Sequence, residues 1–267
     1  MSLRECISKL RKNKKVYICD SPMFSDKNWQ LFQEREKAFW EYEINRPTYN
    51  PDPKEHIKPS LERWGIDTSY FRDKAALEIG SGPFGFFAGV SQINKDHLPK
   101  DLVVSDSLMD FYQKFKISDL IPENAVRLQA PGEDMPFADG SFDVILTDNT
   151  IDHVNDCDRL LQEIRRLLRP DGVLLFSSHI LVGCVRPFKP LIKLVDLNHP
   201  HHFTRGEIDD LFDRNGFHLG SHTSIPLYES EEAIPPEASL FKKCVYFVGF
   251  RVMHTLYGVG KLKGRSR

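Results

Sequence analysis

Leu77-Glu-Ile-Gly-Ser-Gly-Pro-Phe-Gly85 is the stretch of sequence that decides the fold. It joins an apolar run, Ala75 to Ile79, to three glycines at positions 80, 82 and 85. Because glycine has no Cβ, such a backbone can turn sharply and let a nucleotide approach closely. The spacing satisfies the Gly-x-Gly-x-x-Gly pattern of a nucleotide-binding turn between a strand and a helix, which on its own is a weak signal.

Short apolar runs and amphipathic segments alternate beyond this turn. Apolar runs lie at 102–104, 142–146 and 173–176, and a helix is predicted before the last of them. Thr204 and Glu207 have the spacing of a capping box that opens a further helix, and the run Val245 to Val252 predicts a final strand. This alternation is typical of an α/β fold with a parallel sheet covered by helices on both faces.

The chain before this pattern is expected to be helical. A helix is predicted from Ser25, as its N-cap, to about Tyr42, with an aromatic stripe that includes Trp29 and Trp40. We expect residues 1–70 to form an N-terminal helical segment, either a lid over a pocket or a helix packed on the domain. Residues 71–267 then form the main domain, with an insertion around 181–202 that is rich in proline and histidine.

Composition excludes several classes of protein. No run of eighteen apolar residues exists and the first fifteen residues lack a signal-peptide core, so we expect a cytoplasmic protein without a membrane span. The five cysteines form no Cys-x-x-Cys pair, which argues against a disulfide framework or a structural zinc site. Basic residues gather in 1–20 and in 251–267, and the end of the chain from Lys261 to Arg267 is interpreted as a solvated tail. The acidic stretch between them argues against nucleic acid as a partner.

Two acidic residues indicate which nucleotide the turn binds. Glu78 precedes Gly80 by two residues, where a carboxylate would repel a pyrophosphate but suit a ligand with an ammonium group and a sulfonium. Asp106 follows the second apolar run, where an acid can accept both hydroxyls of a ribose. Ser107 and Leu108 come next, with Leu108 placed to pack against an adenine.

Four motifs in order resemble those of the class I S-adenosylmethionine (SAM)-dependent methyltransferases, in the subgroup that acts on small molecules. They are Glu78 to Gly82, Asp106, Asp134 to Asp143, and Asn149 to His153. The resemblance implies a Rossmann-like fold with a mostly parallel seven-stranded sheet, SAM as cofactor and S-adenosylhomocysteine as its product. It also implies cofactor-binding roles for Gly80, Ser81 and Gly82 (methionine and ribose), Asp106 (ribose hydroxyls), Gly132 and Glu133 (adenine), and Asp148 and Asn149 (amino-acid end). One departure is Pro131, where the family often has an aspartate that contacts the adenine amino group.

Methyl transfer needs the acceptor held in line with the methyl carbon, and a hydroxyl acceptor also needs a base. His153, His199 and His201 are the candidates, although the position of His153 favours a structural residue that holds its loop by hydrogen bonds. The sequence places no further ligands beside these histidines, so we expect no metal. The expected acceptor is a small molecule, a saccharide or a natural-product hydroxyl. An NAD(P)-dependent oxidoreductase and a non-catalytic SAM-binding protein are the alternatives, and the sequence does not specify an oligomeric state.

Overall fold

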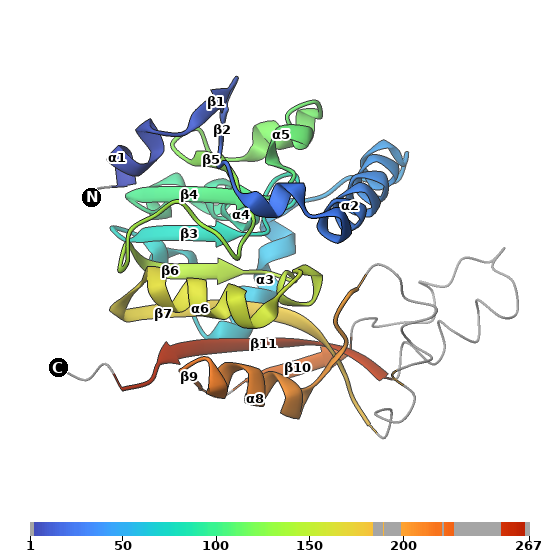
Figure 1. Cartoon of the computed structure of the whole chain (residues 1–267), viewed down its shortest axis with the longest axis vertical. Helices are drawn as coiled ribbons and strands as arrows, with labels where there is room; N and C mark the ends of the chain where they lie inside the picture. Colours follow the sequence, from blue (N-terminus) through green and yellow to red (C-terminus); the bar gives the residue numbers. More distant parts are fainter. Residues whose placement is uncertain (1–2, 184–188, 190–198, 221, 227–251, 265–267) are drawn as a thin grey trace, which may run out of the picture.

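The structure, a computed structural model, describes residues 3–183, 189, 199–220, 222–226 and 252–264 (Figure 1). The described α-helices are α1 (Leu3–Ser8), α2 (Lys27–Asn45), α3 (Pro53–Trp64), α4 (Phe86–Ile93), α5 (Met109–Tyr112), α6 (Cys157–Leu167) and α8 (Arg205–Arg214). The strands are β1 (Arg11–Asn13), β2 (Val16–Ile18), β3 (Ala75–Ile79), β4 (Asp101–Asp106), β5 (Val126–Gln129), β6 (Phe142–Thr147), β7 (Leu168–Leu181), β8 (Phe203–Thr204), β9 (Phe217–Leu219), β10 (Thr223–Pro226) and β11 (Met253–Leu262). Short 3-10 turns lie at Pro22–Ser25, Thr68–Phe71, Lys95–His97, Lys116–Leu120 and Ile151–His153.

All the described strands form a single sheet. Its order is β1-β2-β5-β4-β3-β6-β7-β11-β10, with β8 beside β7 and β9 beside β11. From β2 to β7 the neighbours are parallel, whereas β11 is antiparallel to both β7 and β10. The predicted α/β fold with a mostly parallel sheet is confirmed. The predicted seven strands correspond to β5-β4-β3-β6-β7-β11-β10. The sheet is larger than predicted because β1, β2, β8 and β9 add to it.

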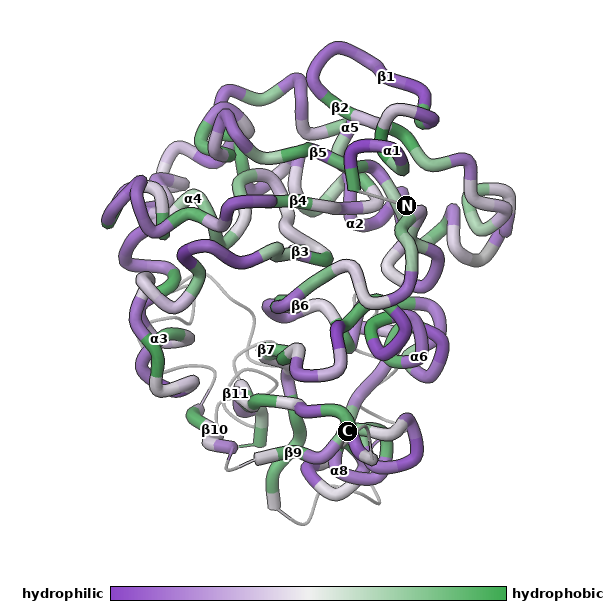
Figure 2. Tube along the Cα trace, turned by 90° about the vertical axis from the view of Figure 1, so that its left-hand side faces the viewer, coloured by the Kyte–Doolittle hydropathy of each residue, from purple (hydrophilic) through white to green (hydrophobic). Residues whose placement is uncertain are grey.

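The two faces of the sheet carry separate apolar cores, as the alternation of side chains along a strand requires. On β3, Leu77 packs in the core that α6 and α8 cover, and Ala76 packs in the core that α3 and α4 cover. Ile145 and Val144 on β6 divide in the same way. Figure 2 views the strands nearly end-on, with α3 and α4 on one side of the sheet and α6 on the other.

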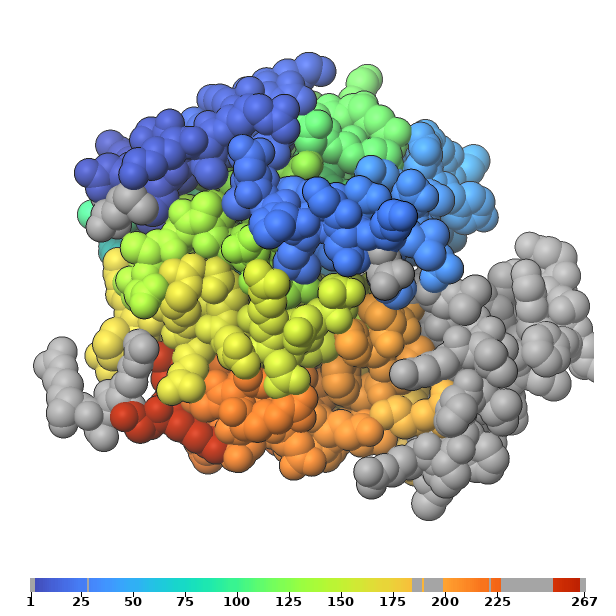
Figure 3. Space-filling model, in the orientation of Figure 1, coloured from blue at the N-terminus to red at the C-terminus, as the bar shows by residue number. Residues whose placement is uncertain are grey.

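The N-terminal segment is only partly helical, which corrects the prediction for residues 1–70. β1 and β2 extend the sheet, because β2 pairs in parallel with β5. α2 begins one residue later than predicted: its N-cap is Asp26, whose side chain accepts a hydrogen bond from the Trp29 N–H at 2.8 Å. In Figure 3 this segment, in blue, covers one end of the molecule above α6, in yellow.

The C-terminal end of the chain extends the sheet beyond the prediction. Residues 253–262 form β11 inside the sheet, and Leu256 is fully buried. Of this strand, only Lys261 and Leu262 fall in the predicted solvated tail, and there the prediction is wrong. The expected strand at 245–252 and most of the expected insertion at 181–202 lie outside the described residues. The capping box is confirmed, with Thr204 and Glu207 bonding reciprocally at the start of α8. Within the described part of the chain, no helix combines the length and the apolar character needed to cross a bilayer.

Candidate active site

The glycine turn after β3 lies at the carboxyl ends of the central strands, where the strand order reverses between β4 and β6. Gly80 and Gly82 have φ angles of +74° and +60°. A Cβ at Gly80 would overlap the Thr150 side chain, whose own Cβ would lie only 2.9 Å away. The backbone N–H groups of Gly80 and Ser81 both donate to the Ser105 carbonyl, at 2.9 and 3.1 Å. The turn is therefore fixed against β4 and against the loop that follows β6.

Glu78 points from β3 to the start of α4. Its carboxylate is buried and accepts hydrogen bonds from the backbone N–H groups of Phe86 at 2.6 Å and Phe87 at 3.5 Å. A Cβ at Gly85 would lie 2.9 Å from this carboxylate, so glycine makes room for it. Burial raises the pKa of Glu78 to about 8, although the two backbone hydrogen bonds lower it. Sequence reasoning assigned Glu78 to the ligand and missed this capping of α4.

Asp106, at the end of β4, is held by the backbone. Its two carboxylate oxygens accept from the N–H groups of Gly82 at 2.9 Å and Leu108 at 2.7 Å. Each oxygen keeps a further lone pair, so the group can still accept two hydroxyl donors. Burial raises the pKa of Asp106 to about 6, although both backbone bonds lower it. Beside it, Ser107 Oγ donates to Gln33 Oε1 on α2 at 2.6 Å.

The pair Gly132 and Glu133 lies beyond β5. A Cβ at Gly132 would lie 2.8 Å from Ile79, so glycine allows this loop to approach β3. Glu133 is buried, and its carboxylate accepts from the backbone N–H groups of Asn155 at 2.9 Å and Asp156 at 3.3 Å. Burial raises the pKa of Glu133. The carboxylate is thus committed to the loop before α6, and its contact with an adenine stays a prediction.

Asp148 and Asn149 follow β6 and share one partner on β7. Ser177 Oγ donates to the Asp148 carboxylate and accepts from the Asn149 N–H at 2.9 Å. Asn149 has a φ of +50°, and its buried Oδ1 makes no hydrogen bond within the described residues. A buried acceptor without a donor is costly, so this oxygen is suited to an N–H group of a ligand.

One face of α2 closes the site. Trp29, Gln33, Glu36 and Trp40 follow helical spacing and line a cavity of about 420 Å³. Glu36 Oε1 lies 3.3 Å from Nδ1 of His153 on the opposite wall, an ion pair when the imidazole is protonated. The helix is packed on the domain and forms a wall of the pocket, and its role as a lid stays a prediction.

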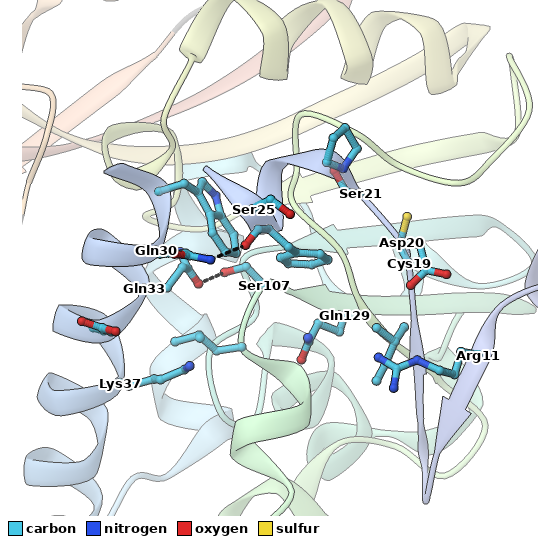
Figure 4. Close-up of a pocket in the computed structure, with 16 residues that line it drawn as sticks. Arg11, Cys19, Asp20, Ser21, Ser25, Gln30, Gln33, Lys37, Ser107 and Gln129 are labelled. Carbon is cyan, nitrogen blue, oxygen red and sulfur yellow. Dashed lines mark hydrogen bonds between the residues drawn. The ribbon is translucent and has the colours of Figure 1, made fainter. Parts of the chain in front are cut away.

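This cavity brings together all eleven residues predicted to bind the cofactor. A second cavity of about 920 Å³ opens beside it, shown in Figure 4, and the Gln33–Ser107 hydrogen bond lies where the two meet. Arg11 and Lys37 line the second cavity from β1 and α2. We take the first cavity as the cofactor site because the glycine turn and Asp106 belong to it alone.

Two of the three candidate histidines line the same cavity. His153 and His199 do so, with ring centroids 4.5 Å apart, and they are joined there by His179 of β7. His201 is not among the lining residues: its Nε2 lies 2.9 Å from the Val154 carbonyl and its ring stacks on Phe203.

His153, His179 and His199 all face Asp152, which is completely buried. Burial alone would raise the pKa of Asp152, but His179, His153 and His199 together hold it below its usual range. Neither Asp152 nor His179 was singled out from the sequence. The acid-His pair at 152–153 was visible there, but nothing local indicates that a strand residue at 179 meets it.

Comparison with known proteins identifies the domain. Residues 77–176 match the family model described as a methyltransferase domain. This stretch is a methyltransferase domain of the class I SAM-dependent type. This stretch runs from β3 to β7 and holds all the predicted cofactor residues as well as His153.

Curated relatives of the chain include methyltransferases. An uncharacterized methyltransferase of Mycobacterium sp. (strain KMS) is 31% identical over 116 residues, which is 41% of this chain and 40% of the relative. The thiol S-methyltransferase TMT1B of Homo sapiens is 50% identical over 52 residues, 19% of this chain and 21% of the relative. The chain therefore matches less than half the length of each of these relatives.

Solved methyltransferase structures share the fold. A putative methyltransferase crystallised with the Haloferax volcanii Trm112 activator superposes with a TM-score of 0.61 at 14% identity, covering 88% of this chain and 97% of that one. A Haemonchus contortus N-methyltransferase in complex with phosphomonomethylethanolamine and S-adenosylhomocysteine superposes with a TM-score of 0.58 at 14% identity, covering 87% of this chain and 59% of that one. The fold prediction is confirmed at this level.

Proposed function

We propose that this chain transfers the methyl group of SAM to a small-molecule acceptor. The observation that carries the proposal is the single cavity at the carboxyl ends of β3, β4 and β6, in which the glycine turn, Asp106 and Asn149 lie together. The match to a methyltransferase domain over the same residues supports it. The cytoplasmic location expected from the sequence stays part of this proposal.

The residues present fit SAM. The turn at Gly80 and Gly82 leaves a cradle that side chains would fill, and Asp106 can accept two ribose hydroxyls. The free Oδ1 of Asn149 can accept from an ammonium group. Asp148 adds negative potential that stabilises the positive charge of the cofactor. When bound, SAM supplies an activated methyl group, so the protein mainly has to position the acceptor.

The acceptor side is formed by aromatic and histidine side chains. Phe39 and Trp40 of α2 line the cavity, and Phe39 is 43% exposed although it is a large apolar residue. An apolar molecule or a sugar ring can stack on such a surface. We keep a saccharide or natural-product hydroxyl as the proposed acceptor, with His153 or His199 as the base. A thiol is the second candidate, because the 50% identical segment belongs to a thiol S-methyltransferase.

Calorimetric titration with S-adenosylhomocysteine tests the cofactor. We expect binding that Asp106→Ala abolishes and that His97→Ala, on a distant 3-10 turn, leaves unchanged. NAD(H) is titrated in parallel, since a literal Gly-x-Gly-x-x-Gly is also compatible with an oxidoreductase. Binding of NAD(H) in place of the homocysteine nucleoside, or binding of neither, contradicts the proposal.

Turnover then identifies the acceptor class. Purified protein is incubated with SAM and with sugar, phenol and small thiol acceptors, and methylated products are detected by mass spectrometry. The base is tested by His153→Gln and His199→Gln, which should lower the turnover of a hydroxyl more than that of a thiol, because thiols ionise near neutral pH. Binding of the nucleoside without turnover of any acceptor favours the non-catalytic alternative.

A further inference from the structure

Asp152 presents an unusual carboxylate to the cavity wall. Its side chain is fully buried, and Oδ1 accepts a hydrogen bond from Ser178 Oγ at 3.0 Å. Oδ2 makes no hydrogen bond to any part of the chain that the structure describes. A buried carboxylate oxygen left in this way is costly unless a charge partner compensates it.

Three imidazoles surround that oxygen. His179 Nδ1 lies 3.5 Å from Asp152 Oδ2, and the Nε2 atoms of His199 and His153 each lie 3.9 Å from it. The His179 contact is electrostatic and not a well-formed hydrogen bond, because Nδ1 also lacks a hydrogen-bond partner within the described residues. Two buried polar atoms thus face each other without satisfying each other.

We propose that Asp152, His179 and His199 bind a divalent transition-metal ion, with zinc preferred. Their ligand atoms all lie within 4.8 Å of one another. Tetrahedral zinc with bonds of about 2.0–2.1 Å places its ligand atoms about 3.3–3.4 Å apart. The separations from Asp152 Oδ2 to His179 and His199 are 3.5 and 3.9 Å. Metal binding would shorten them by about 0.1–0.6 Å.

The donor set determines the choice of metal. Two imidazoles and one carboxylate suit zinc and related ions, whereas Mg²⁺ and Ca²⁺ prefer sites built from oxygen alone. Two of the ligands are held in place by the fold, because Ser178 donates a hydrogen bond to the Asp152 carboxylate and His179 belongs to β7. Such support is typical of a preorganised metal site. The sequence indicated no metal because Asp152 and His179 were not recognised as partners of His199.

Three protein ligands leave a coordination position free, and His179 and His199 line the methyl-donor cavity. A hydroxyl or thiol acceptor bound at that position would lose its proton more readily, to the bulk or to His153. This consequence rests on the proposed methyltransferase function, but the binding of the metal itself does not.

The test is a calorimetric titration of the full chain, freed of metal by chelation and dialysis, with ZnCl₂ and separately with MgCl₂. We expect one zinc ion per chain and no comparable heat with magnesium. Asp152→Asn and His179→Ala should each weaken zinc binding by more than about 100-fold. Loss of a residue that only supports a metal ligand costs at most about 100-fold, so a larger effect indicates a direct ligand. His56→Ala is the matched control, because His56 lines the same cavity outside the cluster and should leave the affinity unchanged.

Two further readouts keep the outcome decisive. Co²⁺ in place of zinc should give the visible absorption of a four-coordinate ion, lost in His199→Ala even if one of the other variants fails to fold. Circular dichroism checks the fold of each variant. No zinc binding, equal affinity for magnesium, or zinc binding unchanged in folded Asp152→Asn would overturn the inference. S-adenosylhomocysteine is titrated on the same samples, so failure of the cofactor proposal is recorded separately.

Discussion

Replacing Gly80 by alanine should destabilise the fold by more than its backbone angle alone accounts for. An alanine held at a φ of +74° costs about 1–2 kcal/mol. The new Cβ would also overlap Thr150, and overpacking of this kind costs about 1–3 kcal/mol more. The free energy of unfolding should therefore fall by about 2–5 kcal/mol, and binding of S-adenosylhomocysteine should be lost because the turn must move.

Gly140 provides the matched control. It has a φ of +64°, but a Cβ there would meet nothing within 4 Å. Gly140→Ala should therefore cost only the backbone contribution, about 1–2 kcal/mol. Urea unfolding followed by circular dichroism measures both variants against the unmodified chain. If the two variants agree within about 0.5 kcal/mol, the usual scatter for independent sites, the close approach of Thr150 does not constrain the turn and the reasoning is refuted.

Two further outcomes follow from buried or paired carboxylates. Because burial raises the pKa of Glu78 to about 8, the folded state binds the carboxyl proton of Glu78 more tightly than the unfolded state does. The free energy of unfolding should therefore fall by up to a few kcal/mol as the pH rises from about 5 to 8. Urea unfolding of Glu78→Gln should show a flatter pH dependence. An equal slope in both proteins would contradict the buried-acid interpretation. Glu36→Gln should weaken nucleoside binding about two- to fivefold, since a partly exposed ion pair to His153 contributes about 0.5–1 kcal/mol, whereas the exposed Glu34→Gln on the same helix should change nothing. Calorimetry measures the affinity of each variant for the nucleoside, and equal affinities would show that Glu36 does not contribute to nucleoside binding.

The sequence predicted the part of the fold that obeys local rules. The run 102–104 is continuously apolar because both faces of its strand are buried, and the glycine turn needs backbone angles that other residues resist. The same local signals placed Asp106 and Asn149 at strand ends, which in a parallel sheet meet at one edge. This is why all the predicted cofactor residues share a cavity.

The rest depended on contacts between distant segments. β1 is short and exposed, so no apolar pattern marks it. β11 contains two glycines and reaches the basic end of the chain at Lys261, where the sequence was interpreted as a tail. Its pairing with β7 makes it a strand. His179 joins the histidine cluster only because β7 runs beside β6.

The position of β11 sets the order in which the sheet can be completed. It separates β7 from β10 and pairs residues as distant in sequence as Tyr257 and Ser177. Contacts between such distant residues form slowly, because a long loop must close before they contribute. Until then β7 offers an open edge that any other extended chain can join. A nascent chain that has made the cofactor-binding strands thus still depends on residues 253–262 to avoid aggregation, so chaperone dependence is expected to be greatest for chains that end before them.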